Sequence, residues 1–252
     1  MTLRAYLPAS HWPTSDLPAP VTLDDAETRH LSSVMRVTLG TPVELLDGAG
    51  RIADATVRSA SKKHVDLDIQ SIRAIPPPAP RRILSVALVR EQQLDWIIQK
   101  AVELGTSEIR LIQTANCVVR LSPDDFARKL SRWTAVALSA CKQSGNPWLP
   151  KILAAPSLEK ALALRAPDEA GAFGALRPGA IPYARWIADT AALTPPPSAR
   201  SVWIGPEGDF TPAESDLLDA SSIAPVTLGP IVLRVETAAL SMLSLLLLYP
   251  SV

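Results

Sequence analysis

Two segments near the end of the chain share a pattern that strongly limits how it can fold. In each, a strand-like run meets a Gly-Pro pair and a helical pattern follows: IGPEGDF at 204–210 and LGPIVLRVETAAL at 228–240. Glycine adopts backbone conformations that side chains forbid, and it lets a ligand approach the main chain closely. Two such turns close together in sequence predict one ligand pocket built largely from backbone. Neither is a phosphate loop, because GxxxxGK[ST] and GxGxxG are absent from the sequence.

The second part of the chain alternates strand and helix patterns. Residues 83–89 form a continuous apolar run, as a strand buried on both faces requires, and a helical pattern follows up to Gly105. Residues 109–112 predict the next strand. Helix starts are indicated at 122–125 and at 211–214, where Thr-Pro-Ala-Glu has the form of a capping box. This alternation predicts an α/β domain with a mainly parallel sheet.

Two stretches of this part bear on its core. A stripe of apolar residues at helical spacing, which includes Trp133 and Cys141, predicts a long helix with Cys141 in the core rather than acting as a nucleophile. Residues 166–200 have a less regular pattern. We expect a strand at Arg185–Ala188, with residues 171–176 as the rival position.

The first part of the chain is rich in strand patterns. Val65, Leu67 and Ile69 alternate with polar residues, and Asp47-Gly48-Ala49-Gly50 is a hairpin signal. A short helix is expected over 24–37, with Leu31, Val34 and Met35 on its apolar side. Together these patterns predict a small β-barrel with one helix.

A proline-rich segment separates the two parts. Consecutive prolines favour an extended, stiff chain, so residues 74–80 are the expected linker. The predicted domains are therefore residues 1–73 and residues 81–252.

Composition excludes several classes of protein. The two cysteines, Cys117 and Cys141, have no CxxC spacing, which argues against a disulfide scaffold or zinc site and fits a reducing cytosol. The N-terminus lacks a signal-peptide run, and the longest apolar stretch, 238–249, is too short to span a membrane. Net charge is zero, but residues 81–151 carry eleven Lys and Arg against six Asp and Glu. That excess is a weak footprint for a polyanion, and charge counts alone favour the alternative of solvated helix faces.

Seven ordered segments resemble the RsmE family of SPOUT-class RNA methyltransferases. They are RAYLP, RHLSSVMRVTLG, LLDGAGRIADATV, QKAVELGTSEI, ACKQSGNPWLP, IGPEGDF and LGPIVLRVETAAL. The resemblance implies an N-terminal PUA-like barrel and a C-terminal α/β domain with a trefoil knot, which general topology rules would not predict. It also implies a cytoplasmic homodimer, without a metal, that uses S-adenosylmethionine to methylate N3 of a uridine in 16S ribosomal RNA, the family target being uracil 1498.

The resemblance also assigns residues to the methyl donor. Backbone groups in tight turns can recognise the adenine edge, while apolar side chains form a wall. The expected donor-binding residues are Ile204, Gly205, Glu207, Gly208, Leu228, Gly229, Ile231, Leu233 and Thr237.

Arg234 and Glu236 are the expected catalytic residues. As N3 of uracil is methylated its proton leaves, and negative charge spreads onto O2 and O4, where a guanidinium such as Arg234 would stabilise it. Glu236 is expected either to act as base or to hold Arg234 in place, and a plain helix N-terminal carboxylate is the alternative.

The RNA must be held by its backbone while the target base leaves its stack. The expected RNA-binding residues are Arg4, Arg36, Lys62, Lys63, Lys100, Arg120 and Lys142.

Several positions depart from the family pattern. Asn116, Asn146 and Ile231 stand where arginine is common, Asp209 where glycine is common, and Val235 where threonine is common. Three positive side chains are thus missing from places expected to face RNA or donor, and asparagine copies an arginine fork only weakly. The alternatives are therefore an RNA-binding homologue that has lost turnover and, with no P-loop lysine to favour it, a nucleotide-binding protein that cradles phosphate in GPEG.

Overall fold

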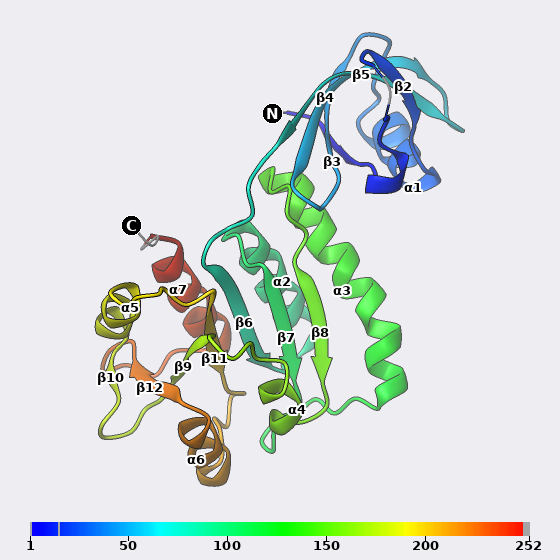
Figure 1. Ribbon diagram of the computed structural model, residues 1–252. Coiled ribbons are helices and arrows are strands. Elements are labelled where there is room, and N and C mark those ends of the chain that lie inside the picture. The colour runs from blue at the N-terminus through cyan, green and yellow to red at the C-terminus, as the bar shows by residue number, and fades with distance from the viewer. Residues whose placement is uncertain (1, 15, 249–252) are drawn as a thin grey trace. The chain divides into compact units, whose positions relative to one another are not determined.

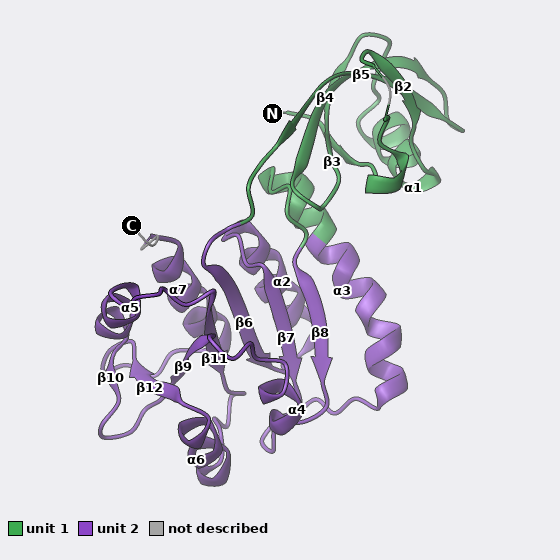
Figure 2. Ribbon diagram, in the orientation of Figure 1, with its two compact units in different colours: residues 1–77, 138–149 green, residues 78–137, 150–252 purple. Residues whose placement is uncertain are grey.

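The computed structural model describes residues 2–14 and 16–248, and the chain divides into two compact units (Figures 1 and 2). Unit 1 comprises residues 1–77 and 138–149, and unit 2 comprises residues 78–137 and 150–252. The division after residue 77 lies in the proline-rich segment. Helix α3 (Pro123–Ser144) starts in unit 2 and ends in unit 1, so residues 138–149 group with the first unit rather than with the expected second domain.

Unit 1 is a five-stranded sheet that curls around one apolar core (Figure 1). The strand order is β1-β3-β4-β5-β2, with β1 parallel to β3 and the other pairs antiparallel. Val65, Leu67 and Ile69 are fully buried, which confirms the alternation in the sequence. Among the described residues no ladder pairs β1 with β2, so the barrel is open between them. The strands are β1 (Arg4–Tyr6), β2 (Ala19–Thr22), β3 (Pro42–Leu46), β4 (Arg51–Ala60) and β5 (Val65–Ala74).

The helix of unit 1 differs from the expected one. Asp24 caps α1 (Asp25–Arg29) by accepting a hydrogen bond from the Glu27 amide at 2.8 Å, and a π-helical turn (His30–Val34) follows. Leu31 is fully buried, but Val34 is 66% exposed and Met35 38% exposed. The prediction that Val34 and Met35 lie on the apolar side of the helix was therefore wrong. A π turn adds a residue to the helical repeat, which rotates later side chains away from the core.

The hairpin of unit 1 packs against the segment that follows α3. The Gly50 amide donates to the Pro147 carbonyl, and the Leu149 amide donates to the Gly48 carbonyl, both at 3.0 Å. Gly50 has a φ of +98°, and a Cβ there would lie 2.2 Å from the Trp148 ring. These contacts explain why residues 138–149 belong with unit 1.

Unit 2 is built on a seven-stranded sheet in which every described pairing is parallel, as predicted. The strand order is β10-β12-β9-β11-β6-β7-β8. Buried parallel strands carry apolar residues on both faces, and β11 is buried at all of its positions. The strands are β6 (Arg81–Ala87), β7 (Glu108–Ile112), β8 (Lys151–Ala155), β9 (Ala170–Gly174), β10 (Ile181–Pro182), β11 (Ala199–Ile204) and β12 (Ile223–Thr227).

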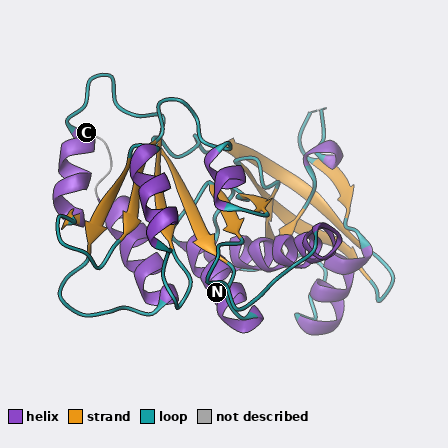
Figure 3. Ribbon diagram, turned by 90° about the horizontal axis from the view of Figure 1, so that it is seen from below, coloured by secondary structure: helices purple, strands orange, loops and turns teal. Residues whose placement is uncertain are grey.

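Helices cover this sheet on both faces (Figure 3). Helices α2 (Glu91–Glu103) and α7 (Val235–Leu248) pack together, and α7 contacts β6 and β11. On the other face α4 (Leu158–Leu162) and α6 (Pro212–Ala220) close a core that includes Phe173 and Trp203. The capping box at Thr211 and Glu214 is confirmed. Over the described residues no helix is long and apolar enough to cross a membrane, and residue 249 of the apolar stretch lies outside them.

The expected strand at Arg185–Ala188 is wrong, because this segment lies in helix α5 (Tyr183–Ala191). Its buried residues Tyr183, Trp186, Ile187 and Thr190 follow a spacing of three and four, which is the period of a helix face. The strand is β9 instead, at the rival position.

Arg200, near the start of β11, is a buried cation that pairs with no anion among the described residues. The residue is 1% exposed, and its Nε and Nη2 atoms have no hydrogen-bond partner among the described residues. Burial lowers the pKa of its guanidinium. The residue beside it on β6 is Arg82, whose Nε donates to the Gly105 carbonyl at 3.2 Å, so this neighbour offers no negative charge.

Replacing Arg200 with methionine should therefore stabilise the fold. Unsatisfied buried polar groups cost about 1–3 kcal/mol, so Arg200→Met is expected to raise the free energy of unfolding by roughly 1 kcal/mol. Urea denaturation measures this change. Arg185→Met, at an exposed position of α5, is the control and should change little. A loss of stability in Arg200→Met would contradict the interpretation.

Candidate functional site

Both glycine turns line one cavity of about 410 Å³ in unit 2. The first turn follows β11 and the second follows β12, and β9 lies between these two strands. Because the strands are parallel, their carboxyl ends meet at one edge of the sheet, which is where α/β folds bind ligands. The volume lies within the range of small-molecule sites, about 300–1,000 Å³. The juxtaposition expected from the sequence is therefore present.

The first turn is tightly packed around its glycine and is held by local hydrogen bonds. A Cβ on Gly205 would lie 3.0 Å from Asp209 Oδ1 and 3.1 Å from the Phe210 amide nitrogen. The Asp209 amide donates to the Pro206 carbonyl at 2.9 Å, and Asp209 has a left-handed φ of 58°. These contacts fold residues 205–209 into a compact wall of the cavity.

The second turn uses glycine for its backbone conformation. Gly229 has a φ of +137°, which side chains rarely adopt, and no atom lies within 4 Å of a Cβ built on it. Thr227 Oγ1 accepts a hydrogen bond from the Gly229 amide at 3.2 Å. The backbone of this turn is thus shaped by torsion angles rather than by crowding.

Two further parts of the cavity wall were not predicted. Gly174 ends β9 and is followed by Ala175 and Leu176, and Gln93 comes from the first turn of α2. The strand pattern at 171–176 could have indicated residues 174–176 as part of the cavity wall, because loops that follow adjacent parallel strands meet at one edge of the sheet. No motif in the sequence marked Gln93, because its position depends on how α2 packs against α7.

Most of the expected donor-binding residues meet in this cavity. Gly208 and Thr237 do not line it, because Gly208 faces Asn116 and Thr237 is exposed on α7. The lining residues among those expected are Ile204, Gly205, Glu207, Leu228, Gly229, Ile231 and Leu233.

The two expected catalytic residues also line the cavity, beside the start of α7. Arg234 is exposed and Glu236 is half-buried. In the part of the chain that the structure describes, no ion pair joins them. Instead, Gln93 Nε2 donates a long hydrogen bond of 3.5 Å to Glu236 Oε2, and Gln93 Oε1 is buried without a partner among the described residues. An unpaired buried acceptor in a cavity wall can receive a hydrogen bond from a ligand.

The expected RNA-binding residues differ in how free their charges are. Arg36, with a left-handed φ of 55°, is exposed, as are Lys62 and Lys63 in the turn between β4 and β5. In unit 2, Lys100 pairs with Glu103 at 2.7 Å and Arg120 donates to the Ala115 carbonyl.

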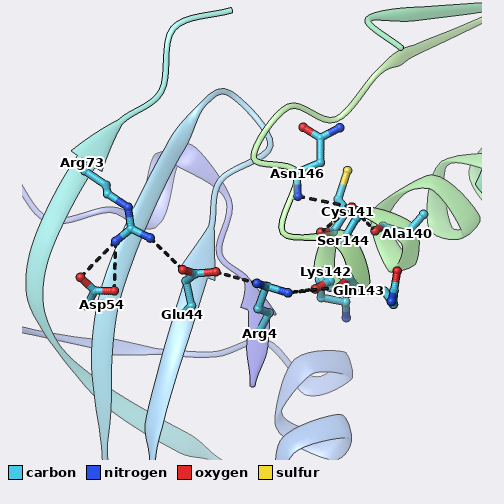
Figure 4. A network of polar contacts seen from close by, with 10 residues as sticks. All are labelled: Arg4, Glu44, Asp54, Arg73, Ala140, Cys141, Lys142, Gln143, Ser144 and Asn146. Atoms are coloured by element: carbon cyan, nitrogen blue, oxygen red, sulfur yellow. Dashed lines mark hydrogen bonds and ion pairs between the residues drawn. The ribbon is translucent and has the colours of Figure 1, made fainter. Parts of the chain in front are cut away.

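Arg4 and Lys142 make structural contacts within unit 1 (Figure 4). Arg4 Nε donates to Glu44 at 2.6 Å, and its Nη1 donates to the carbonyls of Lys142 and Gln143 at 3.2 and 3.1 Å. Lys142 Nζ pairs with Glu27 at 2.6 Å. These bonds tie the end of α3 to the barrel, so both side chains already hold the fold of unit 1.

The positions that depart from the family pattern fall into separate places. Ile231 is 74% exposed at the rim of the cavity, and its neighbour Val232 is 73% exposed. Asn146 lies in unit 1, where its Oδ1 accepts a hydrogen bond from the Trp148 amide at 3.0 Å. Asn116 and Asp209 contact each other: Asn116 Nδ2 donates to the Asp209 carbonyl at 3.0 Å.

The cavity suits a ligand with an apolar body and polar edges. Leu228, Leu233 and Val226 supply apolar surface, whereas the glycine turns expose backbone donors and acceptors. A Cβ on Gly205 would crowd Asp209 and Phe210, so glycine keeps this wall of the cavity compact. These properties fit S-adenosylmethionine, whose adenine has polar edges and an apolar face.

Comparison with known proteins agrees with this geometry. A family model described as RNA methyltransferase domain matches residues 77–247, and one described as RNA methyltransferase PUA domain matches residues 23–70.

Individual relatives match over most of the chain. "Ribosomal RNA small subunit methyltransferase E" of Mycobacterium bovis is 31% identical over 228 residues, covering 89% of this chain and 84% of the relative. The Bacillus subtilis protein of the same name is 29% identical and covers 86% of each chain. A solved structure of such a protein from Neisseria gonorrhoeae, bound to S-adenosyl methionine, superposes with a TM-score of 0.83 at 26% identity, covering 98% of this chain and 97% of that one.

Proposed function

The chain belongs to the RsmE family of RNA methyltransferases, and from that membership we propose that it transfers a methyl group from S-adenosylmethionine to N3 of a uridine in the 16S RNA of the small ribosomal subunit. The observation that carries the proposal is the convergence of the turns at Gly205 and Gly229 on one cavity of about 410 Å³. A relative of similar structure binds S-adenosyl methionine. The uridine at the family's target position is the proposed acceptor.

The chain's own residues bind and orient the donor. Main-chain groups at Gly205 and Gly229 would hold the donor, and Leu228 and Leu233 would supply apolar surface beside it. When bound, S-adenosylmethionine supplies an electrophilic methyl group. The protein's contribution is then to position the reacting atoms and to exclude water from one side of them.

Arg234 and Glu236 act on the uracil. The guanidinium of Arg234 stabilises the negative charge that develops on O2 and O4 as the N3 proton leaves. A carboxylate oxygen of Glu236 accepts that proton, and Gln93 orients the carboxylate through its amide. We assign the base role to Glu236 because its hydrogen-bond partner is Gln93 rather than Arg234, so the carboxylate is not used to hold the guanidinium.

The wider architecture follows from family membership in the same way. We propose a trefoil knot in unit 2, supported by the placing of β12 on the far side of β9 from β11. A homodimer is proposed as well, supported by the apolar residues of α7 that are only half-buried, such as Leu240 and Leu245. The proposed compartment is the cytoplasm. An experimental structure with a threaded backbone would test the knot. Sedimentation at twice the mass of one chain would test the homodimer, and cell fractionation would test the compartment.

A non-catalytic RNA-binding homologue is the second candidate. The exposed Ile231 and Val232 favour it, because an apolar rim replaces the cation expected beside the cavity. Calorimetry with S-adenosylmethionine and methyl incorporation into small ribosomal subunits that lack the modification separate the two. Donor binding with methyl incorporation supports the enzyme, and donor binding without incorporation supports the non-catalytic homologue. If S-adenosylmethionine does not bind, its assignment to this cavity is refuted for both candidates.

Gly229→Ala should weaken donor binding. A φ of +137° is nearly restricted to glycine, and holding an alanine there costs about 1–3 kcal/mol, so we expect roughly a tenfold higher Kd for S-adenosylmethionine. Isothermal titration calorimetry measures it. Gly179→Ala, at a φ of +89° away from the cavity wall, is the matched control and should leave the Kd unchanged. Equal effects of the two changes would contradict the role of Gly229.

A further inference from the structure

Loop 113–121, which follows β7, contacts the first glycine turn from outside the cavity. Asn116 Nδ2 donates to the Gly208 carbonyl at 2.9 Å and to the Asp209 carbonyl at 3.0 Å. Both partners are carbonyl oxygens, so only the amide nitrogen of Asn116 can make these contacts. Two carbonyls on consecutive residues are thus held by one side chain.

The backbone of the same loop adds a second attachment. The Ala115 amide donates to Glu214 Oε1 at 2.7 Å, while Glu214 Oε2 accepts from the Thr211 amide at 2.9 Å. Glu214 belongs to the capping box that starts α6, directly after the turn. Loop 113–121 therefore holds both the turn and the helix start that follows it.

Asp209 explains why the turn needs this support. It is a non-glycine residue with a left-handed φ of 58°, a conformation that persists only where surrounding contacts hold it. Its side chain caps the next residue, since the Phe210 amide donates to Asp209 Oδ1 at 2.7 Å. Asp209 also lines the cavity, so a change in its backbone would alter the wall made by residues 205–209.

We propose that Asn116 is a positioning residue for the methyl-donor site, which fixes the left-handed turn at Asp209 through its amide and thereby shapes the donor pocket. The inference rests on the proposed donor binding. It also joins two departures from the family pattern: the asparagine at 116 and the non-glycine residue at 209 are in contact and act as one unit. Asn116 does not line the cavity, so it acts through the turn rather than by touching the ligand.

The first test compares substitutions at Asn116 by calorimetry and steady-state kinetics. Asn116→Ala should raise both the Kd and the KM for S-adenosylmethionine about tenfold, since two hydrogen bonds are lost, and should leave kcat within about twofold. Asn116→Asp has the same size but places an acceptor against two carbonyls, so it should weaken binding further. Asn146→Ala, at the other asparagine of the sequence, is the matched control for donor affinity.

The second test asks whether Asn116 works through Asp209. Glycine adopts a positive φ without strain, so the turn in Asp209→Gly should hold its shape with less support. In that background Asn116→Ala should raise the Kd by no more than about two- to threefold, a coupling that a double-mutant cycle measures.

The outcomes separate this inference from the proposed function. If the unmodified protein fails to bind S-adenosylmethionine, the proposed function fails. If it binds but Asn116→Ala binds equally well, or raises the Kd as much in the Asp209→Gly background as in the unmodified protein, the positioning role is overturned. A kcat that falls with KM unchanged would also overturn it, because positioning the donor turn acts on donor binding.

Discussion

Replacing Glu169 with alanine is expected to destabilise unit 2 by about 3–5 kcal/mol, the scale of breaking a buried ion pair. Glu169 accepts two hydrogen bonds from Arg110, at 2.9 and 2.8 Å, and their side chains are 0% and 1% exposed. Burial alone would lower the pKa of the Arg110 guanidinium, but the hydrogen bonds and charges of Glu169 and Glu108 raise it. Removing Glu169 leaves much of that buried charge uncompensated.

Urea denaturation measures this loss of unfolding free energy. Hydrogen exchange of the β7 and β11 amides, monitored during the same titration, localises the loss to unit 2. Two units can unfold in separate transitions, so exchange distinguishes them. Asp189→Ala is the matched control, because Asp189 pairs with Arg185 at 3.6 Å on the surface, with side chains 63% and 71% exposed. Exposed pairs contribute about 0–1 kcal/mol. Equal losses in both variants would show that the Arg110 network contributes no more than a surface pair.

Arg234→Ala is expected to leave the Kd for S-adenosylmethionine within a few-fold and to lower turnover by roughly 100-fold, the scale of losing one donor to a developing charge. The reason is the proposed role of Arg234: the residue is exposed and lines the cavity, and its guanidinium is proposed to act on the uracil rather than on the donor. Single-turnover methylation of small ribosomal subunits, with calorimetry for the donor, measures both quantities.

Arg234→Lys and Arg185→Ala sharpen that experiment. Lysine keeps the charge but not the planar fork, so Arg234→Lys should recover only part of the rate. Arg185→Ala removes an exposed cation from α5 and should leave turnover unchanged. Full turnover in Arg234→Ala would remove this residue from the mechanism and leave the charge on O2 and O4 to another group.

Local patterns predicted much of the fold correctly. The capping box at Thr211 and the alternation of Val65, Leu67 and Ile69 correspond to a helix start and a half-buried strand in the structure. Such signals succeed because each depends on residues within one or two turns of chain. The prediction that the two glycine turns line one cavity was correct for a related reason, because parallel strands bring their carboxyl ends to one edge of the sheet.

The errors occurred where the local pattern was short or irregular. The four residues 185–188 are too few to distinguish a strand from a helix, and the helix period shows only over the longer set Tyr183, Trp186, Ile187 and Thr190. The π turn at His30–Val34 shifted Val34 and Met35 off the core by one residue, which composition cannot signal. Arg4 and Lys142 have the charge of RNA contacts, but Glu44 and Glu27 are already their partners.

By itself the sequence determined the strand and helix alternation of much of unit 2, the glycine turns that line the cavity, and the resemblance that identifies the family. Those properties depend on backbone torsion angles and on spacing along the chain. Only the tertiary structure decided that Gln93 reaches Glu236, that Asn116 holds the turn at Asp209, and that residues 138–149 group with unit 1. These contacts join residues far apart in sequence, and side-chain packing in three dimensions, rather than any local pattern, brings them together.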